Sequence, residues 1–95
     1  MLQCICIYKS RVVKSLTVND AVAMRVIKLM HSKGITQYRL EQDAGIFHGA
    51  MDRILQSKNK TVSFTTIFRL ARGFGMTVEE FIDDDLFRRE DIELD

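Results

Sequence analysis

The segment from Gln37 to Leu55 constrains the fold most, because it contains two short amphipathic helical patterns separated by a glycine. Gly45 occupies the position where a turn between two such helices requires a positive φ angle. The apolar residues at the spacings needed to pack the two helices together are Leu40, Ala44, Ile46, Met51 and Ile54. A pair this small cannot bury its apolar faces alone, so the sequence predicts further helices that close a core around it.

Helical patterns before and within this segment have clear start and stop signals. The first helix begins near Asn19, which we expect to cap it, and ends at Gly34, where glycine adopts a left-handed conformation at little cost. Thr36 is expected to cap the second helix, roughly residues 37–43, and the third helix runs to about Gln56.

Two further helices follow a polar, basic loop at residues 57–60. Either Ser63 or Thr65 caps the fourth helix, and Thr77 with Glu80 forms a capping box for the fifth. The absence of proline from the whole chain suits helices joined by short turns. The residues expected to face inward from the first, fourth and fifth helices are Val22, Val26, Ile27, Leu29, Met30, Phe64, Ile67, Phe68, Leu70, Ala71, Phe74, Val78, Phe81 and Ile82.

Charge is distributed unevenly, although the net charge of the chain is only +1. Residues 1–72 contain twelve lysines and arginines against four acidic residues, whereas residues 73–95 contain two arginines against nine acidic residues. A basic body with an acidic tail is typical of a nucleic-acid binder whose tail faces away from the phosphates. The alternative interpretation is solvated surface charge that clusters by chance.

A chain of 95 residues is long enough for one domain, which we place at residues 19–82 between an N-terminal extension, 1–18, and an acidic tail, 83–95. The extension is interpreted as an edge strand, a dimerisation arm or an over-long translated start ahead of Met24. Four apolar residues of the tail either dock as a short element or stay mobile, namely Leu86, Phe87, Ile92 and Leu94.

The only two cysteines are Cys4 and Cys6, and the single residue between them disfavours a mutual disulfide. Two thiols alone do not make a metal site, so we predict no metal, and no cofactor is expected. Since nothing suggests a secreted disulfide scaffold, we predict a reducing, cytoplasmic location. No apolar run approaches the roughly 20 residues of a membrane span, and the start of the chain lacks the pattern of a signal peptide. No catalytic arrangement is visible, so we expect that the protein is not an enzyme.

The segment 37–55, QYRLEQDAGIFHGAMDRIL, resembles the helix-turn-helix of the lambda-repressor/Cro-like family, which is also called the Xre type. The resemblance covers roughly residues 19–82. It includes Gly-Ile-Thr-Gln at 34–37, the Leu40…Gly45-Ile46 turn, the Met51…Arg53-Ile54 ending and the later run IFRLARGFGMTVEEFI. The resemblance implies an all-α fold, namely a compact five-helix lambda-repressor-like DNA-binding domain with an extra N-terminal segment.

Three residues depart from the family pattern. Glu41 stands where the family usually has a small residue, so its carboxylate must reach the rim or bond to amides near the start of the third helix. Phe47 replaces the common Ser or Thr cap, which predicts weak capping of that helix. Gly49 lies in its first turn, where glycine costs about 1 kcal/mol relative to alanine. A close approach of this backbone to DNA would offset that cost.

The resemblance also implies that the third helix enters the major groove with its N-terminal residues leading. The matching positions, which are the candidate base contacts, are Phe47, His48, Gly49, Asp52 and Arg53. Arg53 is expected to bond a guanine with two hydrogen bonds; its alternatives are a phosphate contact or a salt bridge to Asp43 or Asp52. His48 either donates to a guanine or a phosphate, or is an exposed residue with no partner. Phe47 either contacts a thymine methyl group or holds the two helices together. Asp52 accepts from a cytosine amino group, orients Arg53 or simply repels phosphate.

A second set of residues is expected to contact the DNA backbone. Gln37 begins the second helix, where a side-chain amide and free backbone N–H groups can hold a phosphate. Lys58 and Lys60 would set affinity and salt dependence, with a solvated loop as the alternative. The full set of candidate phosphate contacts is Gln37, Tyr38, Lys58, Asn59, Lys60, Thr61 and Ser63.

The function that the resemblance implies is a sequence-specific DNA-binding transcriptional regulator, specifically a repressor that acts by occupying its site. Its partner is double-stranded DNA, and a homodimer on two half-sites is expected from the family. One alternative with the same fold is the antitoxin of a toxin–antitoxin pair, which would bind a protein partner through the acidic tail. The other alternative is a protein-interaction module that has lost DNA binding, which Glu41, Gly49 and Asp52 favour.

Overall fold

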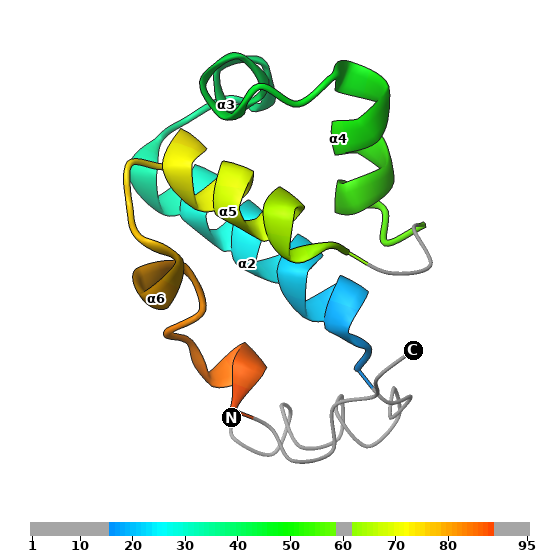
Figure 1. Ribbon diagram of the computed structural model, residues 1–95, viewed down its shortest axis with the longest axis vertical. Coiled ribbons are helices and arrows are strands. Elements are labelled where there is room, and N and C mark those ends of the chain that lie inside the picture. The colour runs from blue at the N-terminus through cyan, green and yellow to red at the C-terminus, as the bar shows by residue number, and fades with distance from the viewer. Residues whose placement is uncertain (1–15, 59–61, 89–95) are drawn as a thin grey trace, which may run out of the picture.

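A computed structural model describes residues 16–58 and 62–88 of the chain (Figure 1). The described part is all-α, as predicted, and it contains five α-helices and one short 3-10 helix. In chain order these are α2 (Val18–Lys33), α3 (Gln37–Ala44), α4 (His48–Leu55), α5 (Phe64–Gly73), α6 (Val78–Phe81) and η1 (Asp85–Phe87). Most of the predicted N-terminal extension, with Cys4 and Cys6, lies outside the described residues.

The helix starts follow capping chemistry, with one correction to the sequence prediction. Thr36 and Ser63 cap α3 and α5 through their hydroxyl groups, and Thr77 forms the predicted capping box of α6. The cap of α2 is Thr17 and not Asn19, because Asp20 stands three residues after Thr17 and returns the hydrogen bond to its backbone N–H. With Asn19 as the cap, the apolar residue Val22 would occupy that reciprocal position.

One apolar core holds the helices together. In the described residues α3 packs on α5, α4 packs on α2, and α6 packs on α5. The buried members of this core are Val22, Val26, Leu29, Leu40, Ala44, Met51, Ile54, Leu70, Ala71, Phe74 and Phe81. Four residues predicted to face inward are instead exposed, namely Ile27, Phe64, Phe68 and Ile82. Phe64 is the first residue of α5, and its ring stacks on Phe68 at the surface with centroids 6.3 Å apart.

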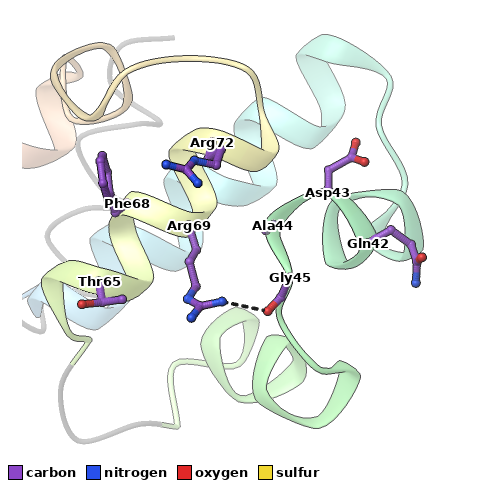
Figure 2. Close-up of a pocket in the computed structure, with 8 residues that line it drawn as sticks. All are labelled: Gln42, Asp43, Ala44, Gly45, Thr65, Phe68, Arg69 and Arg72. Carbon is purple, nitrogen blue, oxygen red and sulfur yellow. Dashed lines mark hydrogen bonds between the residues drawn. The ribbon is translucent and has the colours of Figure 1, made fainter.

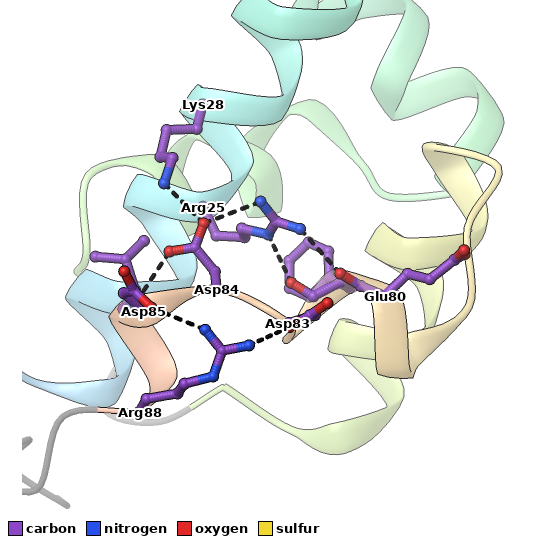
Figure 3. Close-up of polar contacts among 9 residues, drawn as sticks. Arg25, Lys28, Glu80, Asp83, Asp84, Asp85 and Arg88 are labelled. Carbon is purple, nitrogen blue, oxygen red and sulfur yellow. Dashed lines mark hydrogen bonds and ion pairs between the residues drawn. The ribbon is translucent and has the colours of Figure 1, made fainter.

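The first part of the acidic tail is tied to α2 by Arg25, whose side chain is 12 % exposed (Figure 3). Arg25 donates to the backbone carbonyls of Phe81 at 2.6 Å and Glu80 at 2.9 Å, and to the carboxylate of Asp84 at 3.1 Å. The ring of Phe87 lies 6.3 Å from that of Phe81 and packs against the core. Of the two alternatives for the tail, docking as a short element is therefore the one seen at Phe87. Ile92 and Leu94 lie outside the described residues.

Candidate nucleic-acid interface

The turn between α3 and α4 is built around Gly45, as the sequence predicts. Gly45 has φ 69° and ψ 39°, a left-handed conformation that an L side chain rarely adopts. The backbone N–H groups of Gly45 and Ile46 both donate to the carbonyl of Glu41, at 2.9 Å and 3.1 Å. These bonds end α3 and redirect the chain, so that α4 starts in a new direction after three residues.

Arg69 of α5 supports the same turn from the other side (Figure 2). Its guanidinium donates to the carbonyl of Gly45 at 3.2 Å, across an open groove of about 380 Å³ between α3 and α5. Arg72, further along the groove, lies over the ring of Phe68 at 5.5 Å. The sequence analysis missed this role of Arg69, because the donor and acceptor stand 24 residues apart and no local pattern joins them.

The helix α4 buries one side and exposes the other. Met51 and Ile54 are 0 % and 4 % exposed, and they anchor the helix on the core. Phe47, just before the helix, is 86 % exposed, so its side chain does not hold the two helices together. Arg53 is exposed, whereas Asp52 is half-buried. The predicted arrangement, in which the polar tip of a short amphipathic helix projects outward, is present.

The start of α4 is open and weakly capped. Phe47 is the N-cap residue and makes no side-chain capping hydrogen bond, as its side chain predicts. Gly49 follows in the first turn, and a Cβ atom built on it would meet nothing within 4 Å. The backbone of this turn is therefore accessible to a ligand, and none of the described residues lies close enough to require a glycine there.

Four polar side chains of α3 and α4 form one cluster at the junction of the two helices, which we call the polar cluster. Its members are Gln37 and Glu41 of α3, and His48 and Asp52 of α4. Glu41 Oε2 accepts from Gln37 Nε2 at 2.9 Å and lies 2.8 Å from His48 Nδ1. Asp52 accepts from Gln37 Nε2 at 3.0 Å through Oδ1, and its Oδ2 lies 3.4 Å from His48 Nε2.

The polar cluster resolves two open points of the sequence analysis. Glu41 does not reach the rim or bond to amides of α4, since its side chain is only 9 % exposed and contacts the His48 ring and the Gln37 side chain. His48 has partners and is not an isolated surface residue. The hydrogen bond to Glu41, together with the negative charges of Asp52 and Glu41, raises the pKa of His48 above its ordinary value.

The candidate phosphate contacts divide into three groups. Gln37 stands at the first position of α3, with its amide engaged in the polar cluster. Tyr38 is 69 % exposed and Lys58 is exposed, whereas Ser63 caps α5 with its hydroxyl group. The remaining candidates, which lie outside the described residues, are Asn59, Lys60 and Thr61.

Comparison with protein families identifies the fold that carries this site. A family model described as the Cro/C1-type helix-turn-helix DNA-binding domain matches residues 25–85. The chain belongs to this family. Residues 25–85 therefore form a lambda-repressor-like DNA-binding domain of a regulatory protein, which confirms the resemblance seen in the sequence. The comparisons with curated proteins and with solved structures find no match.

Two further properties of the Cro/C1-type domain concern its described residues only. No helix among them has both the length and the apolar character needed to cross a membrane. In the same part of the chain, no three histidine, cysteine or acidic side chains come together at a geometry that would hold a metal ion.

Proposed function

We propose that this Cro/C1-type domain is a sequence-specific transcriptional repressor that reads the major groove with the start of α4. The observation that carries the proposal is the geometry of α4, whose apolar side is fixed on the core while its N-terminal end, residues 47–50, is exposed. A helix held in this way at a glycine turn is the element that helix-turn-helix proteins insert into the major groove.

The proposed base contacts come from the exposed side of α4. Arg53 is assigned the main specific contact, since a guanidinium can donate two parallel hydrogen bonds to the O6 and N7 atoms of guanine. His48 is assigned to a neighbouring base or phosphate group and Asp52 to a cytosine amino group, with the orientation of both side chains set by the polar cluster. Phe47, which is 86 % exposed, is assigned a thymine methyl group, and Gly49 a close backbone approach.

The proposed backbone contacts flank α4 on both sides. Gln37 and Tyr38 stand at the start of α3, where free N–H groups favour a phosphate. Lys58, just after the end of α4, and Ser63, the cap of α5, are assigned to the second flank. Asn59, Lys60 and Thr61 are proposed with them from the sequence alone, since they lie outside the described residues. Such contacts position α4 and supply most of the salt-dependent affinity, but they carry no sequence information.

The proposed mode of action is occupancy by a homodimer in the cytoplasm. Two copies would bind half-sites about 34 Å apart, the spacing of one turn of DNA, and so block polymerase. One domain of this size offers a small interface, and linking two binding events raises the overall affinity of the pair above that of either domain alone. The acidic turn before η1 lies at the opposite end of the molecule from α3 and the start of α4, where it does not repel the phosphates (Figure 1).

The proposal is tested by selecting bound duplexes from a random pool and then titrating the recovered sequence with salt. We expect a motif with two-fold symmetry and a steep, linear fall of log affinity with log salt concentration. A recovered pool without a motif would contradict sequence-specific binding, and no binding at low salt would identify an interaction module instead. A small protein that co-purifies and binds together with DNA would identify an antitoxin.

A further inference from the structure

The polar cluster places an imidazole ring between two carboxylates. Both ring nitrogens of His48 face a carboxylate oxygen, Nδ1 that of Glu41 at 2.8 Å and Nε2 that of Asp52 at 3.4 Å. Only the doubly protonated ring can donate in both directions, because the neutral ring has one N–H and one lone pair. The neutral form would direct its lone pair at one of the two carboxylates. The geometry therefore favours the imidazolium form.

The environment of the ring is asymmetric. The Glu41 side chain is 9 % exposed, whereas the His48 side chain is 71 % exposed. The charged groups that act on the ring are Glu41 of α3 and Asp52 of α4, and the third neighbour in the cluster, Gln37, is neutral. The carboxylate of Glu41 thus holds the ring from the inner side, and the outer side faces the surface at the start of α4.

The charge of the cluster decides how it interacts with a polyanion. With a neutral ring and both carboxylates ionised, the cluster carries two negative charges, and protonation of His48 reduces this to one. Phosphates brought close to the cluster repel the doubly negative form more strongly, and an approaching negative charge favours protonation of a histidine. Binding of DNA and binding of a proton should therefore stabilise each other.

We propose that Glu41 is a positioning residue that favours the imidazolium form of His48 at the start of α4, and that DNA binding takes up a proton wherever the ring of the free protein is still partly neutral. The proposal rests on the proposed function, since it requires the start of α4 to face the DNA. It also gives a reason for a buried carboxylate at a position where the family pattern usually has a small residue. Glu41 fixes the ring of His48 and the amide of Gln37 at once.

The sign of the pH dependence follows from this linkage. His48 would have a higher pKa in the complex than in the free protein. At a pH below both pKa values, His48 is protonated in the free protein and in the complex alike, so the affinity for DNA is constant there. As the pH rises through the interval between the two pKa values, affinity falls by up to about tenfold per pH unit for one linked proton.

The experiment has one arm with DNA and one arm without it. Affinity for a fluorescent duplex that carries the selected sequence is measured by anisotropy from about pH 6 to about pH 9 at constant ionic strength. In parallel, the ring protons of His48 are titrated by NMR in the free protein. The variants are Glu41→Gln, which keeps the shape and removes the charge, and His48→Arg, which keeps the charge and removes the titration. The matched control is His31→Gln at the other histidine of the chain, which is exposed near the end of α2.

We expect the wild-type protein and the His31→Gln variant to lose affinity with rising pH along the same curve. Glu41→Gln should shift that curve and the NMR titration of His48 to lower pH. His48→Arg changes a proposed DNA contact, so its affinity at about pH 6 should differ from that of the wild type, but that affinity should not fall with rising pH in this way. Equal pH dependence in the wild type and His48→Arg, or an unchanged His48 titration in Glu41→Gln, would overturn the proposal. A wild-type protein that binds no duplex at any pH would overturn the proposed function instead, and the NMR arm would still report whether Glu41 holds the ring.

Discussion

Gly73 of α5 lies against Ala44 of α3 so closely that a methyl group on Gly73 would come within 2.8 Å of the Cβ atom of Ala44. The same methyl group would lie 2.9 Å from a Cδ atom of Leu40 and 3.2 Å from the Cα atom of Ala44. Both neighbours are buried, and one of the three atoms belongs to the backbone. The contact sets how closely α3 and α5 approach, and α3 in turn carries the turn that aims α4.

Replacing Gly73 by alanine should therefore destabilise the domain. The added methyl group gains helix propensity, but it overpacks a filled interface, which costs about 1–3 kcal/mol. Thermal unfolding followed by circular dichroism should show a midpoint lower by roughly 5–15 °C for a domain of this size. An unchanged midpoint would mean that α3 and α5 separate without cost, contrary to the close packing described above.

Gly49→Ala is the matched substitution at the other helical glycine, and its effect should be of the opposite kind. Nothing lies within 4 Å of the added Cβ atom, so stability should stay the same or rise by up to about 1 kcal/mol. Affinity for the selected duplex should nevertheless fall, because the methyl group would stand between the α4 backbone and the DNA. A variant that is equally stable and binds with wild-type affinity would remove Gly49 from the interface.

Arg25 and Lys28 both bind Asp84, but their removal should have very different consequences. The side chain of Arg25 is 12 % exposed and also bonds two backbone carbonyls, whereas that of Lys28 is 57 % exposed. Arg25→Ala leaves the part-buried Phe81 carbonyl without this donor, removes one of the two cations on Asp84, and should cost on the order of 3 kcal/mol. Lys28→Ala removes a surface ion pair and should cost less than about 1 kcal/mol. Urea unfolding of both variants measures the difference, and equal losses would contradict the assigned roles.

The carboxylate of Asp84 should make stability depend on pH in the acid range. Burial alone would raise its pKa, but hydrogen bonds from Lys28 and the Leu86 N–H and the charges of Lys28 and Arg25 hold the pKa below its ordinary value of 3.8. The ionised form therefore stabilises the fold above that value, and the stabilisation is lost as the pH falls through the lower, folded-state pKa. The stability difference between wild type and Asp84→Asn should narrow from about pH 5 to about pH 3. A constant difference would show that the charge of Asp84 contributes nothing.

The parts of the fold that follow from local chemistry could be predicted from the sequence. The caps at Thr36 and Thr77 and the left-handed turn at Gly45 need only residues within one helical turn of each other. The buried side of α4 follows from the spacing of Met51 and Ile54. These features were sufficient to identify the helix-turn-helix.

The contacts that could not be predicted join residues far apart in the chain. Arg25 and Asp84 are separated by 59 positions, and nothing in the sequence near either one indicates the other. Phe64 fits the apolar period of α5 but is 69 % exposed. The period predicts which side of a helix a residue faces, but it does not predict how far along that side the neighbouring helices extend. The contact between Glu41 and His48 depends on the angle between α3 and α4, which only the folded turn defines.

Base and phosphate contacts should be separable by comparing Arg53→Ala with Lys58→Ala, since both side chains are exposed on or just after α4. Loss of a bidentate contact to guanine should cost about 1–3 kcal/mol on the selected sequence and relax the preference at one base pair in each half-site. Loss of a phosphate contact should weaken all sequences about equally and reduce the salt slope by about one. Anisotropy titrations against the selected duplex and single-base variants, each at several salt concentrations, distinguish the two patterns. If both variants weaken every duplex equally, Arg53 contacts the backbone and the base readout belongs to other residues of α4.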